Sequence, residues 1–366
     1  MAKHHSLTER NLDRRSFLFG TGVLGIGALG AGLAGCAPQG GGLSETGIAA
    51  GEAVEDSATP WLDYSFMKRE PVGEPEETIE CDFVICGGGG SGLAALLMAD
   101  DLGLNAILLE KKAQCGGTFA FPAAGFFPNN KYALEAGKEV DYNDLIKDIM
   151  TYNHHIPSYR TLKAFMNETP EAIDWLENLG CEFMAMIPKG NTAGPFAKGT
   201  CVRYVGGTDE GGTAGGQAVI NTLIAEANKR GLDIRCDTAA KELVQDESGA
   251  VTGVLAVDSG GKVTQYNAKG VLVSTGGWAN NDDMLRELGG VDPERVISPG
   301  FDGRDGDGVY MARKAGAAWA RGNGTIMFYG PHLPGPTWGE AVSNGVYQPT
   351  MWVNQNGVRF MNEGIN

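Results

Sequence analysis

Glycines at a fixed spacing, followed by one acid, are the residues whose types and positions most directly suggest chemistry. Residues 87–92 follow the pattern G-x-G-x-x-G, with Gly87, Gly89 and Gly92 in the fixed positions. Bare backbone there permits a tight turn, close approach to a pyrophosphate and packing of a helix on a strand. Glu110 follows Gly92 by 18 residues, where a carboxylate can bind a ribose 2′-hydroxyl and would repel the 2′-phosphate of NADP. The pattern predicts a dinucleotide site that includes Gly87, Gly89, Gly90, Ser91, Gly92 and Glu110.

The elements around these glycines have the order that such a site requires. Residues 79–86 form one apolar, partly β-branched run and are predicted to be a buried parallel strand. Helix-forming residues at 93–99 continue to a stop at Gly103, and residues 106–109 predict a second buried strand that ends at Glu110. The helix would direct free N–H groups and a partial positive charge at the phosphates. A glycine-rich loop without a ligand is the weaker interpretation of this ordered set.

A second glycine pair distinguishes between the two common dinucleotides. Gly116 and Gly117 stand just past the ribose acid, where bare backbone lets the chain run along a long extended cofactor. This favours FAD, and an NAD-binding module is kept as an alternative. Lys111, Gly116, Gly117 and Thr118 join the predicted cofactor-binding residues.

The rest of the chain adds to an α/β pattern. Residues 213–230 are amphipathic at helical spacing. Short alternating runs with turn residues between them, over 233–268, predict an antiparallel meander laid against the parallel sheet. Residues 271–275 predict another buried strand, which breaks into a glycine turn at Gly276 and Gly277.

Several segments together resemble the fumarate reductase and succinate dehydrogenase flavoprotein family, and within it the flavocytochrome c, urocanate reductase and 3-ketosteroid dehydrogenase branch. The resemblance runs from Asp82 to the last residue. It is carried by DFVICGGGGSGLAAL (82–96), ILLEKKAQCGGT (107–118), GGTAGGQAVINTLIAEANKRGLDI (211–234), KGVLVSTGGWANNDDML (269–285), RDGDGVYMARKAGA (304–317) and MWVNQNGVRFMNE (351–363).

The resemblance implies a fold and a cofactor. The fold is a Rossmann-like FAD-binding domain, with a parallel sheet and an antiparallel meander, followed by the start of an α+β capping domain. It implies that backbone near Ala240 meets adenine, that Thr275, Gly276 and Gly277 pass the phosphates, and that Asp307 anchors the cofactor. A helix N-cap is an equal alternative for Asp307. No histidine stands where membrane-bound members attach FAD, so the flavin is expected to be non-covalent.

The reaction implied by the resemblance is hydride transfer between flavin N5 and the C=C bond of an α,β-unsaturated carboxylate or enone. His332 stands where family reductases hold the substrate carboxylate, although an isolated histidine is more often structural. The element Arg359–Glu363 is present, but the family's proton-donating arginine beyond it is not found before Asn366. We expect an incomplete site that binds FAD poorly and does not turn over. The alternative is a non-catalytic fragment or degraded relative.

The N-terminal residues predict export. Residues 1–36 resemble a twin-arginine signal with Arg14 and Arg15, and they end at Cys36 in a possible lipoprotein box. Residues 37–78 predict a flexible linker, 79–325 the FAD-binding domain and 326–366 the beginning of the capping domain. The expected location is therefore the bacterial cell envelope, outside the cytoplasm, with a possible lipid anchor at Cys36. Because the chain has no CxxCH haem motif, a separate membrane-linked carrier is expected to donate electrons.

Composition narrows the classes of partner. The formal net charge is −16, and no basic stripe offsets it, which argues against binding to nucleic acid. The seven cysteines show no CxxC pair, and His154 and His155 have no ligand partner at suitable spacing, so no metal site is predicted. Residues 353–359 predict a hairpin with an Asn-Gly turn, in which Arg359 is structural.

Overall fold

The computed structural model describes residues 64–122, 124–186, 201–205, 215–294, 302–318, 351 and 353–359. The predicted export signal, Cys36 and the first part of the predicted linker lie outside these residues. His332, Asn366 and most of the predicted capping segment also lie outside them. Among the described residues, no helix has the length and apolar character needed to cross a membrane.

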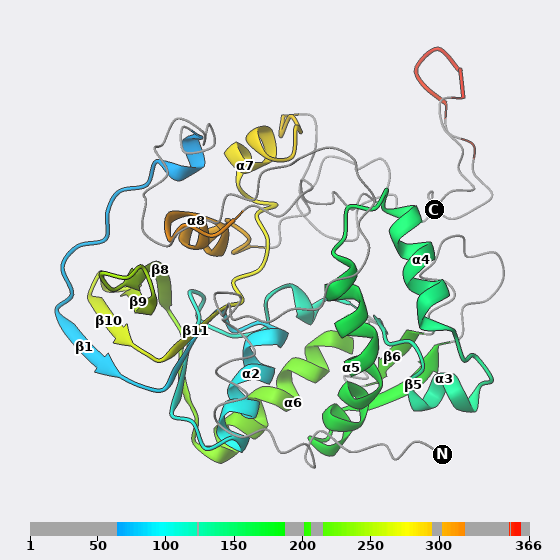
Figure 1. The fold of residues 1–366 in the computed structure, drawn as a ribbon, viewed down its shortest axis with the longest axis horizontal. Coiled ribbons are helices and arrows are strands. Elements are labelled where there is room, and N and C mark those ends of the chain that lie inside the picture. Colours follow the sequence, from blue (N-terminus) through cyan, green and yellow to red (C-terminus); the bar gives the residue numbers. More distant parts are fainter. Residues whose placement is uncertain are drawn as a thin grey trace, which may run out of the picture.

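A four-stranded parallel sheet in the order β11-β2-β3-β7 forms the centre of the fold (Figure 1). The strands are β2 (Phe83–Cys86), β3 (Ala106–Leu109), β7 (Asp233–Arg235) and β11 (Gly270–Val273). Strands β2 and β3 are buried at every position, since both faces of this sheet are covered. This confirms the predicted parallel sheet.

Successive side chains of β2 enter two different cores. Phe83 and Ile85 pack with helices α2 (Gly90–Asp101) and α6 (Gly215–Arg230). Val84 and Cys86 pack on the opposite face with residues of the antiparallel meander. Figure 1 shows the two helices on one side of the sheet and strands β8 to β10 on the other. The sheet is therefore the middle layer of three.

The meander forms as predicted, from β8 (Thr238–Gln245), β9 (Val251–Asp258) and β10 (Val263–Asn267). The single strand predicted over 79–86 is wrong. Its first part belongs to β1 (Glu77–Glu80), which pairs in parallel with β10 in the meander sheet, and only β2 lies in the central sheet. The chain changes sheets at Cys81, whose N–H donates to the Asn267 carbonyl at 3.0 Å. The break between β1 and β2 therefore depends on Asn267, a residue distant in the sequence.

Helix α6 buries the predicted apolar face. Ile220, Leu223 and Ala227 are buried, and Arg230 at its last turn forms ion pairs with Asp100 and Asp101 at the end of α2. These ion pairs hold the C-terminal ends of the two helices together.

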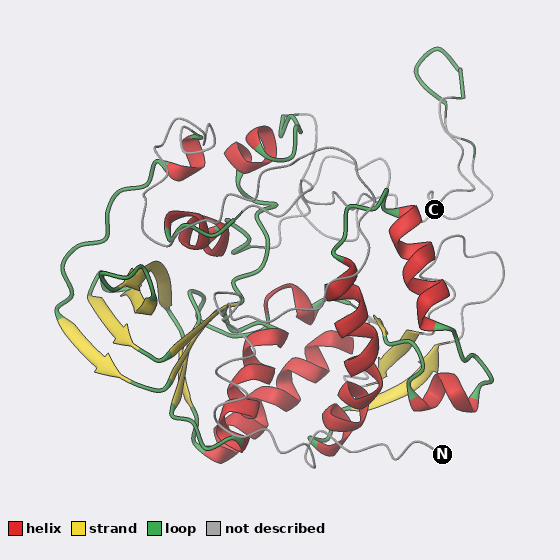
Figure 2. Cartoon of the chain, viewed as in Figure 1, coloured by secondary structure: helices red, strands yellow, loops and turns green. Residues whose placement is uncertain are grey.

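A further α/β unit, whose elements were not predicted from the sequence, follows the cofactor loop and lies on the right in Figure 2. It is not separate, because Ile173 and Phe183 of this unit pack into the core that contains residues of α2 and α6. It has a three-stranded antiparallel sheet in the order β4-β6-β5. Asn130, Asp141 and Ser158 cap its three helices with side-chain oxygens. Its elements are β4 (Ala124–Phe126), α3 (Lys131–Glu135), α4 (Tyr142–Tyr152), α5 (Tyr159–Asn178), β5 (Glu182–Met186) and β6 (Cys201–Val205).

The last part of the predicted linker is ordered and packed. The short helix η3 (Ser65–Met67) contacts α7 (Asp282–Glu287) and α8 (Asp307–Lys314), and Phe66 is buried against Met284 and Leu288. The Ser65 N–H and hydroxyl donate to Glu287 Oε1 at 2.8 and 2.7 Å. For residues 64–78, the prediction of a solvated tether is therefore wrong, because distant acids bind their polar groups.

Candidate functional site

The first and third glycines of the motif are fixed by neighbouring backbone. Gly87 leaves β2 with φ +110, and a Cβ there would lie 2.6 Å from the Ser274 carbonyl oxygen. A Cβ at Gly92 would lie 1.9 Å from the Gly87 carbonyl oxygen. Both positions exclude a side chain, so the strand turns and the helix packs as the spacing predicts.

Gly89 differs from these two because its α-carbon faces open space. The nearest atom to a Cβ built there is the Gly116 carbonyl oxygen at 3.9 Å. Gly89 is also the N-cap of α2, and no side chain caps the helix. The first turn of a twelve-residue helix is thus uncapped next to this open space, an arrangement that can bind phosphate oxygens.

Glu110 follows β3 directly and is 9% exposed. Its Oε2 accepts from the Gly88 N–H at 2.7 Å, and its Oε1 accepts from the Lys112 N–H at 2.9 Å. Each carboxylate oxygen has a second lone pair, so both can still accept from a hydroxyl. The backbone therefore orients the carboxylate without using its full capacity, as a ribose-binding acid requires.

The second glycine pair lies against the first. The Gly116 N–H donates to the Gly88 carbonyl at 2.9 Å, and Gly89 and Gly116 form an isolated parallel bridge. Gly116 has φ +142, a backbone conformation that favours glycine. Thr118 is exposed in the short helix η4 (Gly117–Ala120), which follows. The structure thus brings the two predicted loops together at the carboxyl edge of the sheet, where ligands bind in open α/β folds.

The turn after β11 completes one side of this edge. The Ser274 hydroxyl donates to the Cys86 and Gly87 carbonyls at 3.0 and 3.1 Å. Thr275 Oγ1 accepts from the Gly308 N–H at 2.9 Å. Gly276 and Gly277 are exposed, and a Cβ at either would meet no atom within 4 Å. These two glycines therefore present open backbone beside the motif.

Asp307 and Lys111 bind each other. Lys111 Nζ lies 2.7 Å from Asp307 Oδ2 and 2.6 Å from Asp305, and Arg69 Nη1 lies 2.6 Å from Asp307 Oδ1. Burial alone would raise the pKa of Asp307, but hydrogen bonds from Lys111 and Arg69 outweigh it and hold the pKa below its usual range. The N-cap alternative is wrong, because Gly306 is the N-cap of α8 and Asp307 is its first residue.

Arg69 is a residue of this edge that was not predicted from the sequence. It lies in the segment assigned to the linker, 238 residues from its partner Asp307. Its guanidinium also stacks over the Tyr310 ring, 4.5 Å from the centroid. No local pattern marks such a contact. The contact ties the N-terminal segment to the start of α8, where Asp307 also binds Lys111, the residue after Glu110.

Ala240 is buried on β8 in the core shared by the central sheet and the meander. Its neighbour Thr238 donates its N–H to the Glu110 carbonyl at 2.9 Å, which brings the start of β8 to the ribose acid. The predicted contact between the backbone near Ala240 and adenine stays a prediction. His332 lies outside the described residues.

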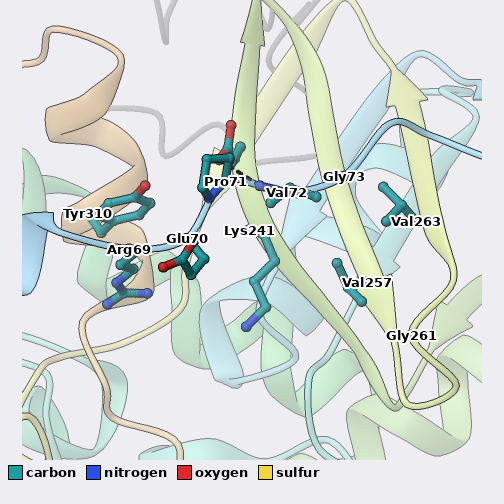
Figure 3. A pocket seen from close by; sticks show the side chains of 11 residues that line it. Arg69, Glu70, Pro71, Val72, Gly73, Lys241, Val257, Gly261, Val263 and Tyr310 are labelled. Carbon is teal, nitrogen blue, oxygen red and sulfur yellow. Dashed lines mark hydrogen bonds between the residues drawn. The ribbon is translucent and has the colours of Figure 1, made fainter.

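A pocket of about 400 Å³ lies between residues 69–73 and the meander. Figure 3 shows Arg69 next to Tyr310 at one end and Val257 and Val263 at the other.

The hairpin predicted at residues 353–359 forms, with the Asn354 N–H donating to the Val358 carbonyl at 2.9 Å and Val353 bridged to Arg359. His154 and His155 are exposed, and the described residues contain no group of three metal-ligating side chains.

The sequence model of the FAD binding domain family matches residues 82–365. The chain belongs to this family. Vinyl phenol reductase of Lactiplantibacillus plantarum is 30% identical over 294 residues, 78% of this chain and 57% of that protein. Fumarate reductase (cytochrome) of Shewanella frigidimarina is 28% identical over 310 residues, 82% of this chain and 50% of that protein. The chain thus spans about half the length of these curated relatives.

The fold agrees with this assignment. A flavocytochrome c3 fumarate reductase, solved in an open conformation, superposes with a TM-score of 0.58 at 25% identity, over 67% of this chain and 41% of that chain. The predicted family and the predicted FAD cofactor are confirmed. The residues present also fit FAD, because an uncapped helix end, three open glycines and an oriented carboxylate share one edge of the sheet.

Proposed function

We propose that the protein is an FAD-dependent oxidoreductase of the cell envelope. It reduces the C=C bond of an α,β-unsaturated carboxylate or enone, or catalyses the reverse reaction. A separate membrane-linked carrier supplies the electrons. The observation that carries the proposal is the open edge formed by Gly89, Gly276 and Gly277 around the uncapped start of α2, with Glu110 oriented beside it.

The residues of this chain bind and orient the cofactor non-covalently. The N–H groups at the start of α2 bind the diphosphate. Glu110 binds the ribose of the adenosine, and backbone near Ala240 meets the adenine. Gly116, Gly117 and Thr118 follow the extended cofactor, and the Thr275–Gly277 turn passes its phosphates. When bound, FAD supplies the hydride acceptor and donor.

The substrate class rests on the relatives and on one residue. The two relatives named above are, by their names, reductases of a vinyl phenol and of fumarate, and both of these molecules contain a C=C bond. His332 is proposed to bind the substrate carboxylate or carbonyl, where donors stabilise the charge that develops during reduction.

The location is proposed from the N-terminal sequence. Arg14 and Arg15 precede a weakly apolar, glycine-rich run that ends at Cys36, which supports twin-arginine export and a lipid anchor. A protein exported by this route would receive its FAD before it leaves the cytoplasm.

The test is made on the protein produced from its natural gene. We expect it to purify with a flavin absorbance spectrum, and the flavin to be released intact by denaturation because no covalent link is formed. After anaerobic reduction, the flavin should be reoxidised by an unsaturated carboxylate or enone and not by its saturated counterpart. Failure to bind FAD would overturn the proposal. Bound FAD with no reoxidation by any such acceptor would favour a non-catalytic relative that keeps only the binding framework.

A further inference from the structure

Two cysteines that are far apart in the sequence meet at the cofactor edge. Cys115 immediately precedes Gly116, and Cys236 immediately follows β7. Strands β3 and β7 are parallel neighbours, with Leu109 opposite Arg235, so the residues that follow them reach the same edge. The Asp237 N–H donates to the Lys112 carbonyl at 2.9 Å, which holds the two loops together. The position of each cysteine is therefore fixed by backbone pairing.

Cys236 packs against the same core cluster that contains the buried Cys115. Within this cluster each thiol affects the pKa of the other, as expected for neighbouring groups. Cys115 is 9% exposed, whereas Cys236 is only half-buried, so a reagent can reach the second more easily. Both are free thiols in the structure. The pair is thus close, reduced and accessible from one side.

Cys115 also forms the back wall of the dinucleotide loop. A Cβ built at Gly88 would lie 2.5 Å from Cys115 Sγ and 3.1 Å from Glu110 Oε2. The Gly88 backbone is held on both sides of Cys115 in the sequence: its N–H donates to Glu110, and its carbonyl accepts from the Gly116 N–H. A change at Cys115 therefore acts directly on the backbone that would carry the cofactor.

We propose that Cys115 and Cys236 are a disulfide-forming pair that locks the loop of residues 110–117 onto the end of β7. The Cys236 thiolate attacks a disulfide of the environment, forming a mixed disulfide and releasing one thiolate. The Cys115 thiolate then attacks Cys236 Sγ, which closes the intramolecular bond and releases the second thiolate. The two thiol protons pass to the released thiolates, and two electrons pass from the cysteine pair to the oxidant.

The surroundings predict a slow reaction at neutral pH. Burial raises the pKa of Cys115 to about 12, with further contributions from Cys236 and Glu110. Burial also raises the pKa of Cys236. Cys115 partly lowers this pKa, and the carboxylates of Glu110 and Asp237 raise it further. Because only the thiolate attacks, the rate should rise about tenfold per pH unit in the neutral range. Such a bond would form after folding, during long residence in an oxidising compartment.

The effect on the cofactor rests on the proposed function of this edge in binding FAD. The bond would tie the residue before Gly116 to the end of β7, so the loop over the diphosphate would open less often. We expect FAD to dissociate several-fold more slowly from the oxidised protein. The melting temperature should rise by several degrees, because the bond closes a long stretch of chain.

The first experiment is peptide mapping of the folded protein after incubation with oxidised glutathione. We expect a peptide in which Cys115 is joined to Cys236 and from which two hydrogen atoms are lost. The yield should rise with pH. Only glutathione adducts, or links to other cysteines, would overturn the proposal. The map needs no variant, so a failure of a variant to fold does not affect it.

The second experiment compares FAD release before and after oxidation. Cys236→Ser should abolish the difference between the oxidised and reduced proteins. Cys181→Ser is the matched control, because Cys181 is also buried but its thiol is near Thr222. This control should keep the difference. A protein that forms the Cys115–Cys236 bond but binds no FAD would retain the disulfide and refute the proposed cofactor function instead. Equal FAD release in both redox states would overturn the locking effect.

Discussion

The glycines around the cofactor edge fall into two groups that differ in what surrounds each α-carbon. Gly87, Gly88 and Gly92, which we term the packed glycines, would place a Cβ within 2.6 Å of protein atoms. Gly89, Gly276 and Gly277, the open glycines, would place a Cβ no closer than 3.9 Å to any atom outside the adjacent residues of the chain. The packed glycines are required by the fold, whereas the open glycines leave space that only a ligand uses. Substitutions of the packed glycines should therefore lower stability, whereas substitutions of the open glycines should leave stability largely unchanged and weaken cofactor binding.

The strongest way to break this comparison is Gly92→Ala. Its methyl group would lie 1.9 Å from the Gly87 carbonyl oxygen, so the helix must move away from the strand. We expect the free energy of unfolding to fall by about 3 kcal/mol, measured by urea titration. Gly89→Ala, with open space around the new methyl group, is the control and should stay within about 1 kcal/mol of the native protein. Equal stability of the two variants would contradict the distinction.

The complementary test is a large side chain on the open side. Gly89→Leu should leave the unfolding midpoint near that of Gly89→Ala, because the nearest atom to a Cβ at this position lies 3.9 Å away. It should weaken FAD binding on the order of 100-fold, about 2.8 kcal/mol, since it occupies the approach to the helix N-terminus. Fluorescence titration with FAD measures the change. Native affinity in Gly89→Leu would show that the cofactor does not approach this glycine.

Glu110→Gln tests a residue that binds backbone N–H groups of the protein and, in the proposed function, the ribose of the cofactor. The amide keeps the shape but places an NH₂ donor against either the Gly88 N–H or the Lys112 N–H. We expect a loss of about 1–2 kcal/mol in stability, because one buried donor loses its acceptor. FAD affinity should fall about tenfold, as the ribose hydroxyls lose a charged acceptor. Asp305→Asn, near the same loop but more exposed, is the control and should keep FAD affinity.

The parts of this site that the sequence predicted are local, and those that it missed are not. The motif at 87–92, the strand before Glu110 and the meander need only neighbouring residues for their prediction. The break between β1 and β2 depends on Asn267, and the Arg69–Asp307 pair joins residues 238 positions apart. Cys115 and Cys236 meet only because β7 pairs with β3. The helices at 142–178 were predictable, because Asp141 and Ser158 are ordinary capping residues before them.

The smallest effect on stability is expected for the ion pairs that Asp307 forms with Lys111 and Arg69. The pKa of Asp307 is below its usual range in the folded protein because hydrogen bonds from Lys111 and Arg69 outweigh the effect of burial. The unfolded chain therefore binds the proton more tightly. The stabilising contribution is complete above about pH 4, the ordinary pKa of aspartate, and is lost as the pH falls through the lower folded value. The free energy of unfolding should decline over that acid interval.

Asp307→Asn isolates this contribution. The variant should be less stable at pH 7 by about 1 kcal/mol, and the difference from the native protein should shrink as the pH falls below about 4. Arg69→Lys removes the planar guanidinium that both pairs with Asp307 and stacks on Tyr310, and it should reproduce only part of the loss. Urea unfolding between pH 3 and 7 gives the measurement. A constant difference across the interval would mean that Asp307 acts through packing alone, and that the charges around it do not stabilise the edge to which Lys111 and Glu110 belong.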